Sequence, residues 1–125
     1  MAMPQSSKIQ TVEEIVAIVT GAVCLRRPIS AFYHRCRRSL CPHVLGRSKH
    51  GGLNVLCYQY GGDSVSGLKY RGSADNWRCI SLPKLTAVCF LDEAWETAED
   101  HVRPQSCITE VFFDAEQLFA AGSGR

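Results

Sequence analysis

The stretch LNVLCYQY, residues 53–60, decides the fold, because its residues sort into two faces with the two-residue period of a β-strand. Successive side chains of a strand point to opposite sides of the sheet. One face would carry Leu53, Val55, Cys57 and Gln59, and the other would carry Asn54, Leu56, Tyr58 and Tyr60. The segment is therefore predicted to be a strand of a β-sheet.

Four more short runs around this segment have the composition of β-strands. Pro42 interrupts one of them, and Pro83 separates the last two, where a residue that cannot donate to a ladder marks a strand end or a bend. The glycines of SKHGG, residues 48–52, predict a turn. The four runs are ISAFYH (29–34), SLCPHVLG (39–46), NWRCISL (76–82) and LTAVCFLD (85–92).

A helix is predicted before the strands. Thr11 and Glu14 have the spacing of a capping box, in which each side chain accepts a hydrogen bond from the other residue's backbone amide. Apolar residues follow at helical spacing, and Pro28 confirms that the helix has ended. The helix should run from residue 12 to about 25.

A second helix is predicted after the strands, with Ser106 as its N-cap and Gly122 as the glycine that ends it. Its apolar stripe would consist of Ile108, Val111, Phe112, Ala115, Leu118 and Phe119. The order of helix, about five short strands and helix predicts a mostly β (α+β) fold, a small curled sheet or barrel whose open ends the helices cover. One domain would span 11–121, between a flexible terminus (1–10) and a tail (122–125).

The composition is that of a cytoplasmic protein with no membrane partner. The 125 residues suffice for one domain, and no window approaches about 18 uninterrupted apolar residues. The N-terminus has no cationic segment followed by an apolar core, so no secretory signal is expected. Most of the seven cysteines lie in apolar runs, which favours reduced, buried thiols.

Charge is unevenly distributed along the chain, although the net charge is only +2. No Asp or Glu lies between Ile15 and Gly62, whereas eight acidic residues follow from Asp92 onward. The basic segment can attract nucleic acid or another anion, or its arginines can pair with the acidic residues near the C-terminus. The basic residues concerned are Arg26, Arg27, Arg35, Arg37, Arg38, Arg47 and Lys49.

The motif Gly62-Asp63-Ser64 suggests a hydrolase nucleophile, but its surroundings argue against one. The lipase-type elbow G-x-S-x-G would need a glycine where Ser66 stands. The GDSL hydrolases carry a D-x-x-H block near the C-terminus, and Ala98 stands three residues before the late His101. No catalytic residue is therefore predicted, and the chain is not expected to be an enzyme.

Two other patterns suggest a chemical site, but both are incomplete. The glycines from Gly62 to Gly67 have Walker spacing, but Leu68 stands in place of the lysine and no helix is expected to follow. Cys36, Cys41 and His43 have ligand-like spacing, but a structural zinc site usually adds a second short cluster, which is missing. The sequence therefore predicts no metal and no cofactor.

Many moderately specific positions together resemble the WYL domain, and more narrowly the short, nearly stand-alone proteins related to it. The resemblance extends from residue 12 to about 115. The Trp-Tyr-Leu triplet that names the family would fall at Asn54-Val55-Leu56, where the leucine is kept. The positions that carry the resemblance are Ile29, Tyr33, Arg38, Pro42-His43, Leu45-Gly46, Leu56-x-Tyr58-Gln59, Gly62, Ser64, Ser66-Gly67, Trp77-Arg78, Leu82 and Leu85.

The resemblance implies an SH3-like, Sm-type small β-barrel and a regulatory rather than enzymatic function. WYL domains are sensory modules of bacterial and phage-defence systems that are thought to bind nucleotides or single-stranded nucleic acid through a basic groove. The alternative is a scaffold without a small ligand, which binds a protein partner or forms a homo-oligomer through strand edges, because exposed edges are adhesive.

If a ligand is bound, Arg38 is the first candidate to carry its charge, since the planar guanidinium suits phosphate. His43 could donate to the ligand or could be a packing residue, and Trp77 could stack on a base or belong to the core. Arg78 should point away from Trp77, because neighbours on a strand face opposite sides. The full set of predicted ligand-binding residues is Arg38, His43, Tyr58, Gln59, Ser64, Ser66, Trp77 and Arg78.

Overall fold

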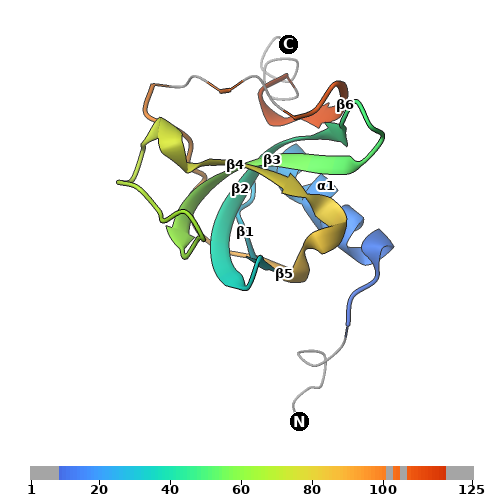
Figure 1. The fold of residues 1–125 in the computed structure, drawn as a ribbon, viewed down its shortest axis with the longest axis horizontal. Coiled ribbons are helices and arrows are strands. Elements are labelled where there is room, and N and C mark those ends of the chain that lie inside the picture. The colour runs from blue at the N-terminus through green and yellow to red at the C-terminus, as the bar shows by residue number, and fades with distance from the viewer. Residues whose placement is uncertain (1–8, 101–102, 105–106, 118–125) are drawn as a thin grey trace.

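The computed structural model describes residues 9–100, 103–104 and 107–117. They form helix α1, six strands and two short 3₁₀-helices, shown in Figure 1, and residues 115–117 are helical as well. The helix is α1 (Val12–Leu25), and the 3₁₀-helices are η2 (Ala74–Asn76) and η3 (Leu82–Lys84). The strands are β1 (Ile29–Tyr33), β2 (Cys36–Arg47), β3 (Leu53–Gly62), β4 (Trp77–Ser81), β5 (Thr86–Phe90) and β6 (Glu110–Asp114).

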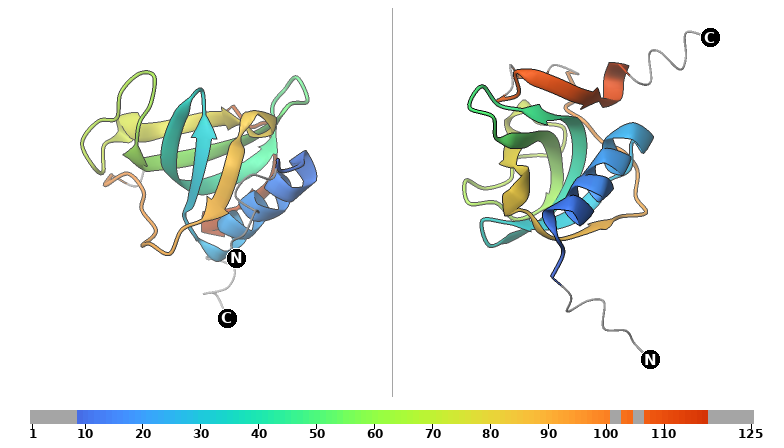
Figure 2. Two further views of the ribbon diagram at one scale, coloured as in Figure 1. Left: turned by 90° about the horizontal axis from the view of Figure 1, so that it is seen from below. Right: turned by 90° about the vertical axis from the view of Figure 1, so that its right-hand side faces the viewer.

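The strands form one antiparallel sheet in the order β4-β3-β2-β1-β5, with β6 paired to β2 off this path. β3 runs along one edge of β2, and β1 and β6 share the other edge. The β2–β3 ladder shifts register twice, once between Pro42 and Val44, and β2 bends strongly (Figure 2). Pro42 therefore lies at an irregularity within one long strand and does not end it.

The prediction of a mostly β fold with an N-terminal helix is confirmed, while the sheet differs from the expected five-stranded barrel. It has six strands, and it is open, because the ladder ends at β4 and β5 in the described part of the chain. The strand predicted from residues 53–60 is β3, and the other four predicted runs correspond to β1, β2, β4 and β5.

Helix α1 covers one face of the sheet (Figure 2). Its capping box is formed as predicted: Thr11 Oγ1 accepts from the amide of Glu14, and a carboxylate oxygen of Glu14 accepts from the amide of Thr11. The buried stripe of α1 packs against the sheet and forms the main core with it. The helical members of this core are Ile15, Val19, Ala22 and Val23.

Both faces of β3 are buried, by different parts of the chain. Val55 and Cys57 point toward α1 and belong to the main core. On the other face, Tyr58 packs with Ala98 and Trp95, and Leu56 packs with Ile108. The segment between β5 and β6 therefore covers the second face of the sheet, and the alternation of residues 53–60 is confirmed.

The predicted C-terminal helix is wrong over Glu110–Asp114, which form strand β6, while residues 115–117 are helical. The reason is tertiary. The Val44–Arg47 half of β2 offers an unpaired edge, and β6 satisfies its backbone groups there. A Cβ on Gly46 would overlap the carbonyl oxygen of Glu110, so the bare glycine lets the two backbones approach. Ser106, Leu118, Phe119, Gly122 and the predicted tail lie outside the described residues.

The N-terminal segment is better fixed near the helix than predicted. The side-chain amide of Gln10 donates to the carbonyl of Val88 and accepts from its amide, both at 2.8 Å, so it extends the edge of β5 like a short strand. The rest of the predicted flexible terminus, residues 1–8, lies outside the described residues.

The cysteines depart from the expectation of reduced, buried thiols at one pair. Cys79 on β4 and Cys107 form a disulfide, with their Cα atoms 6.3 Å apart. The bond ties the segment that covers the second face to the edge of the sheet. The five other cysteines are free, and Cys41 and Cys57 among them are buried.

Candidate anion-binding site

The eight predicted ligand-binding residues separate into two groups on opposite faces of the sheet. One group gathers where β2 begins and β3 ends, and it consists of Arg38, Gln59, Ser64, Ser66 and Arg78. The other group lies under the covering segment and consists of His43, Tyr58 and Trp77. The register explains the division, because Cys57 pairs with Arg78 and Tyr58 pairs with Trp77 across β3 and β4.

Arg38 is a buried cation, only 3% exposed. Its Nε donates to the carbonyl of Tyr33 at 3.1 Å, and its Nη1 donates to Oε1 of Gln59 at 3.1 Å. The guanidinium also lies 5.3 Å from the centroid of the Tyr33 ring. Backbone, amide and ring thus fix its position at the start of β2.

Arg78 reaches the same amide oxygen from the other side, since its Nε lies 3.3 Å from Oε1 of Gln59. Its Nη2 donates to the hydroxyl of Ser64 and to the carbonyl of Gly67, and its Nη1 donates to the carbonyl of Asp75. The guanidinium therefore holds the loop between β3 and β4 through hydrogen bonds to three of its residues. Gln59 is the shared acceptor of the two arginines, which we call the arginine pair (Arg38 and Arg78).

Every acceptor around the arginine pair is neutral. Within residues 9–100, 103–104 and 107–117, no carboxylate forms an ion pair with either guanidinium. Burial lowers the pKa of Arg78, and the nearby charge of Arg38 lowers it further. Buried charges are normally paired with an opposite charge. The site thus has two positive charges and one shared amide oxygen, and the carboxylate of Asp75, whose charge raises the pKa of Arg78, forms no ion pair with it.

The acidic residues form ion pairs elsewhere. Glu96 pairs with Arg71, and Asp114 and Glu116 lie against Arg103. Among the ion pairs between described residues, none involves Arg27, Arg35, Arg37, Arg38, Arg47 or Lys49. For these six residues, pairing with the acidic residues near the C-terminus is not seen in the described part of the chain.

The tip of the β1–β2 hairpin adds exposed charge beside the arginine pair, and sequence reasoning did not single it out. His34 and Arg35 both have positive φ, 50° and 65°, in a two-residue loop. The carbonyl of Tyr33, just before this loop, accepts from Arg38, and the carbonyl of Arg37 accepts from the amide of Asp63. Two central residues with positive φ are typical of a type I′ turn, which usually carries Asn-Gly, so the pair His34-Arg35 is not recognisable as a turn from its residue types.

The loop after β3 is held in place by polar contacts. The amide of Gln59 donates to the carbonyls of Gly61 and Asp63, at 2.9 and 2.7 Å. Oγ of Ser64 lies 3.3 Å from that of Ser66, and the side chain of Asn76 bonds to the backbone at Lys69 and Tyr70. The hydrogen-bond partners of the Ser64 hydroxyl in the described structure are Ser66 and Arg78, and no histidine is among them.

The second group of predicted residues is a packed aromatic cluster. His43, 2% exposed, lies between the rings of Trp77 and Trp95, with centroids 4.8 and 4.6 Å away. Burial lowers the pKa of His43 from 6.5 to about 4, so the ring is neutral near pH 7. Its Nε2 lies 3.4 Å from the carbonyl oxygen of Glu96, and its Nδ1 has no hydrogen-bond partner in the described structure.

Tyr58 in this cluster is fully buried, and its hydroxyl donates to the carbonyl of Ser73 at 2.8 Å. The ring of Trp77 packs edge-on against Tyr58 and His43. Neither Tyr58 nor His43 can contact a ligand unless the covering segment opens. The packing interpretation of His43 and the core interpretation of Trp77 therefore agree with the structure.

The thiol of Cys41 lies beside this cluster. Its Sγ accepts from the amide of Glu96, and burial raises the pKa of the thiol to about 12. Among the residues that the structure describes, no three His, Cys, Asp or Glu side chains are grouped so as to hold a metal ion. The same part of the chain contains no helix long and apolar enough to cross a membrane.

No protein-family model matches the chain, and no curated protein and no solved structure is significantly similar to it. The case for any function therefore rests on the geometry of the site itself.

Proposed function

We propose that the chain is a non-enzymatic, WYL-like sensing module that binds a phosphate-bearing ligand, a nucleotide or single-stranded nucleic acid, at the arginine pair. The observation that carries the proposal is the convergence of Arg38 and Arg78 on one neutral amide oxygen. A phosphate would supply a counter-charge in direct contact with the two guanidiniums, whose donors suit its oxygens bidentately. In this proposal the strongly bent sheet is an opened relative of the SH3-like, Sm-type barrels.

The exposed residues of the β1–β2 hairpin suit an extended anion. Arg35 is exposed at its tip. Arg37 and Phe32 pair across the hairpin on the face opposite to Arg38, and the guanidinium of Arg37 lies 5.6 Å from the ring centroid of Phe32, which is 39% exposed. Single-stranded nucleic acid is bound by cations along the backbone together with aromatic rings that stack on bases. Phe32 thus takes the stacking role that Tyr58, which is buried, cannot take.

Binding at this site would change the loop after β3. Arg78 holds Ser64 and Gly67, so a phosphate that takes these donors competes with the loop for them. Release of the loop would expose the backbone groups of residues 63–67 to a partner. The exchange of hydrogen bonds at Arg78 would thus change the conformation of the loop, and a partner could detect that change. No covalent bond of the ligand needs to be made or broken.

The proposal is tested by fluorescence anisotropy of a labelled oligothymidine, and by competition with mononucleotides, at several salt concentrations. Arg78→Gln should weaken binding about tenfold, and Arg35→Gln should lower the salt slope by about 0.7, the value for one phosphate contact on a single strand. Arg27→Gln is the matched control, because Arg27 is exposed but lies before the far end of β1, over Phe90.

Melting temperatures of all three variants show whether the fold is kept. If Arg27→Gln weakens binding as much as Arg78→Gln does, the loss of affinity comes from the lower net charge and not from a contact of Arg78. An absence of binding to every nucleotide and oligonucleotide at low salt would refute the proposal.

A further inference from the structure

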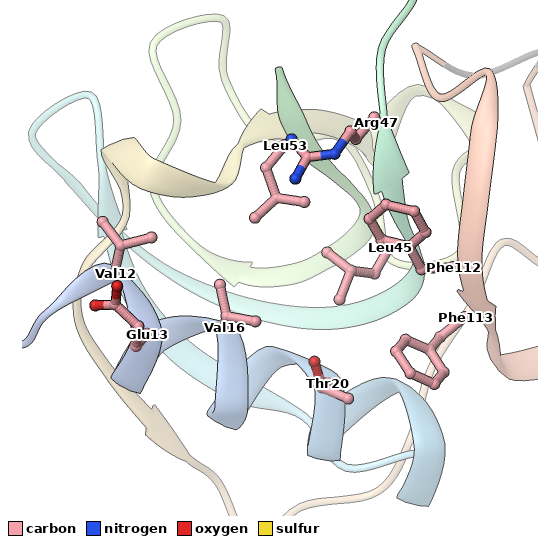
Figure 3. Close-up of a pocket in the computed structure, with 9 residues that line it drawn as sticks. All are labelled: Val12, Glu13, Val16, Thr20, Leu45, Arg47, Leu53, Phe112 and Phe113. Carbon is pink, nitrogen blue, oxygen red and sulfur yellow. The ribbon is translucent and has the colours of Figure 1, made fainter. Parts of the chain in front are cut away.

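A concave site lies at the other end of the sheet from the arginine pair. It is a cavity of about 410 Å³ between α1, the end of β2, the start of β3, and β6 (Figure 3). Small-molecule sites commonly have volumes of about 300–1,000 Å³. The residues that line the cavity are Val12, Glu13, Val16, Thr20, Leu45, Arg47, Leu53, Phe112 and Phe113.

The body of the cavity is apolar and partly open to water. Val12, Phe112 and Phe113 on its rim are 43%, 42% and 37% exposed. Val16 and Leu53 pack against the main core beneath it. Covering these side chains with an apolar group would remove hydrocarbon from water, which is the main favourable term in binding such a ligand.

Arg47 supplies a fixed positive charge at the rim. Its own carbonyl accepts from the amide of Thr109, and Nη1 of its side chain donates to the carbonyl of Gly51 at 2.9 Å. The guanidinium lies 5.7 Å from the centroid of the Phe112 ring. No ion pair to Arg47 is formed within the part of the chain that the structure describes, so its remaining donors can bind a carboxylate side-on.

The acidic residue of the lining, Glu13, has a different role. It lies in the first turn of α1, where a negative charge is stabilised by the N-terminal end of the helix. The position of Glu13 at the N-terminal end of α1 accounts for its negative charge. The positive charge of Arg47 is therefore the feature of the lining that favours a negatively charged ligand.

We propose that this cavity binds a small amphiphilic monocarboxylate, with the apolar body between α1 and the two phenylalanines and the carboxylate on Arg47. The site is independent of the arginine pair, because the two lie at opposite ends of β2. For a ligand of roughly ten heavy atoms that binds with the modest efficiency typical of drug-sized molecules, the expected dissociation constant is on the order of 1 mM.

The test uses octanoate and 1-octanol as a charged and an uncharged probe of the same length. Both are titrated into ¹⁵N-labelled protein, and amide shifts of α1 and β6 are followed. Octanoate should bind about tenfold more tightly than 1-octanol and shift the amides near Val16 and Phe113. In Arg47→Gln the two probes should bind equally, with 1-octanol unchanged from the parent protein.

Two further variants separate charge from shape. Glu13→Gln is the matched control, and it should bind octanoate as tightly as the parent or more tightly, since it removes a negative charge. Thr20→Trp fills the cavity from α1 and should abolish the binding of both probes while the melting transition is retained.

Three outcomes would overturn the proposal. The first is an absence of saturable shifts at α1 and β6 up to several times the expected dissociation constant. The second is equal affinity of the parent protein for octanoate and 1-octanol. The third is a dimer, detected by sedimentation, whose formation buries Phe112 and excludes octanoate, because the occupant would then be a second copy of the chain.

Discussion

Gln59 and Tyr58 are neighbours on β3 and point to opposite faces of the sheet. The buried ionisable side chains on these two faces differ in whether they are charged. On the Gln59 face, two arginines stay charged and are served by neutral acceptors. On the Tyr58 face, His43 is buried between two indoles and gives up its charge. The difference follows from chemistry, because a guanidinium cannot lose its proton in a protein whereas an imidazole can. A buried arginine therefore stays charged and is stabilised by an anion. A buried histidine can become neutral and then gains nothing from one.

The largest effect is expected from the shared acceptor. Gln59→Leu removes the oxygen that both guanidiniums use and should lower the free energy of unfolding by about 4 kcal/mol, as for other buried charges that lose a partner. Urea denaturation measures the change. Gln59→Glu is the informative counterpart, because it places a carboxylate between the arginines. That variant should keep the fold and lose anion binding, and unchanged oligonucleotide affinity would contradict the assigned site.

The disulfide that fastens the cover of the Tyr58 face comes next. Cys107→Ser opens a link across 28 residues of chain, and loop closure of that length is worth about 3.5 kcal/mol. The melting temperature should fall, and a reducing agent should lower it in the parent protein but not in the variant. The free Cys89, which is exposed, offers the matched control Cys89→Ser, for which no change is expected.

Protonation of His43 tests the charge-free face directly. Its pKa is about 4 in the folded chain and 6.5 when unfolded, so the unfolded state takes up the proton first as pH falls. The contribution is fully present above pH 6.5 and declines by about 3 kcal/mol between pH 6.5 and 4. His43→Phe should remove this decline. Denaturation of both proteins across that range measures the difference, and parallel curves would contradict the role of His43.

The smallest effect is expected at the hairpin tip. His34 and Arg35 hold positive φ angles that Asn and Gly adopt more readily. The double substitution His34→Asn and Arg35→Gly should raise stability by about 1 kcal/mol and weaken oligonucleotide binding. A gain in stability with unchanged binding would show that the strained turn does not serve the ligand.

Local signals in the sequence were sufficient for α1 and β3. The capping box of Thr11 and Glu14 marked the start of the helix, and the alternation of residues 53–60 described both faces of β3 correctly. The C-terminal region could not be predicted in this way. The apolar residues between 108 and 115 have helical spacing, but the backbone of Glu110–Asp114 pairs with an edge of β2 that lies more than sixty positions earlier in the chain.

The candidate site was predicted in part for the same reason. Arg38, Gln59 and Arg78 were each named, but their convergence depends on the register that sets Arg78 opposite Cys57. Periodicity also could not reveal that residues 91–100 cover the aromatic group, since that segment contains no regular element. Contacts between distant parts of the chain thus decided which predicted residues share a site.

Gly46 has a consequence for how the molecule is assembled. The β1–β2 and β2–β3 hairpins connect neighbours in the chain, whereas β6 must close a loop of about sixty residues before it can pair, which is slow. During synthesis the N-terminal part emerges first, so the edge at Gly46 waits unpaired for its partner. The same close approach that admits β6 leaves an open strand edge in the incomplete chain. β6, which is made last among the described strands, is thus the strand that covers this edge and protects the nascent sheet from aggregation.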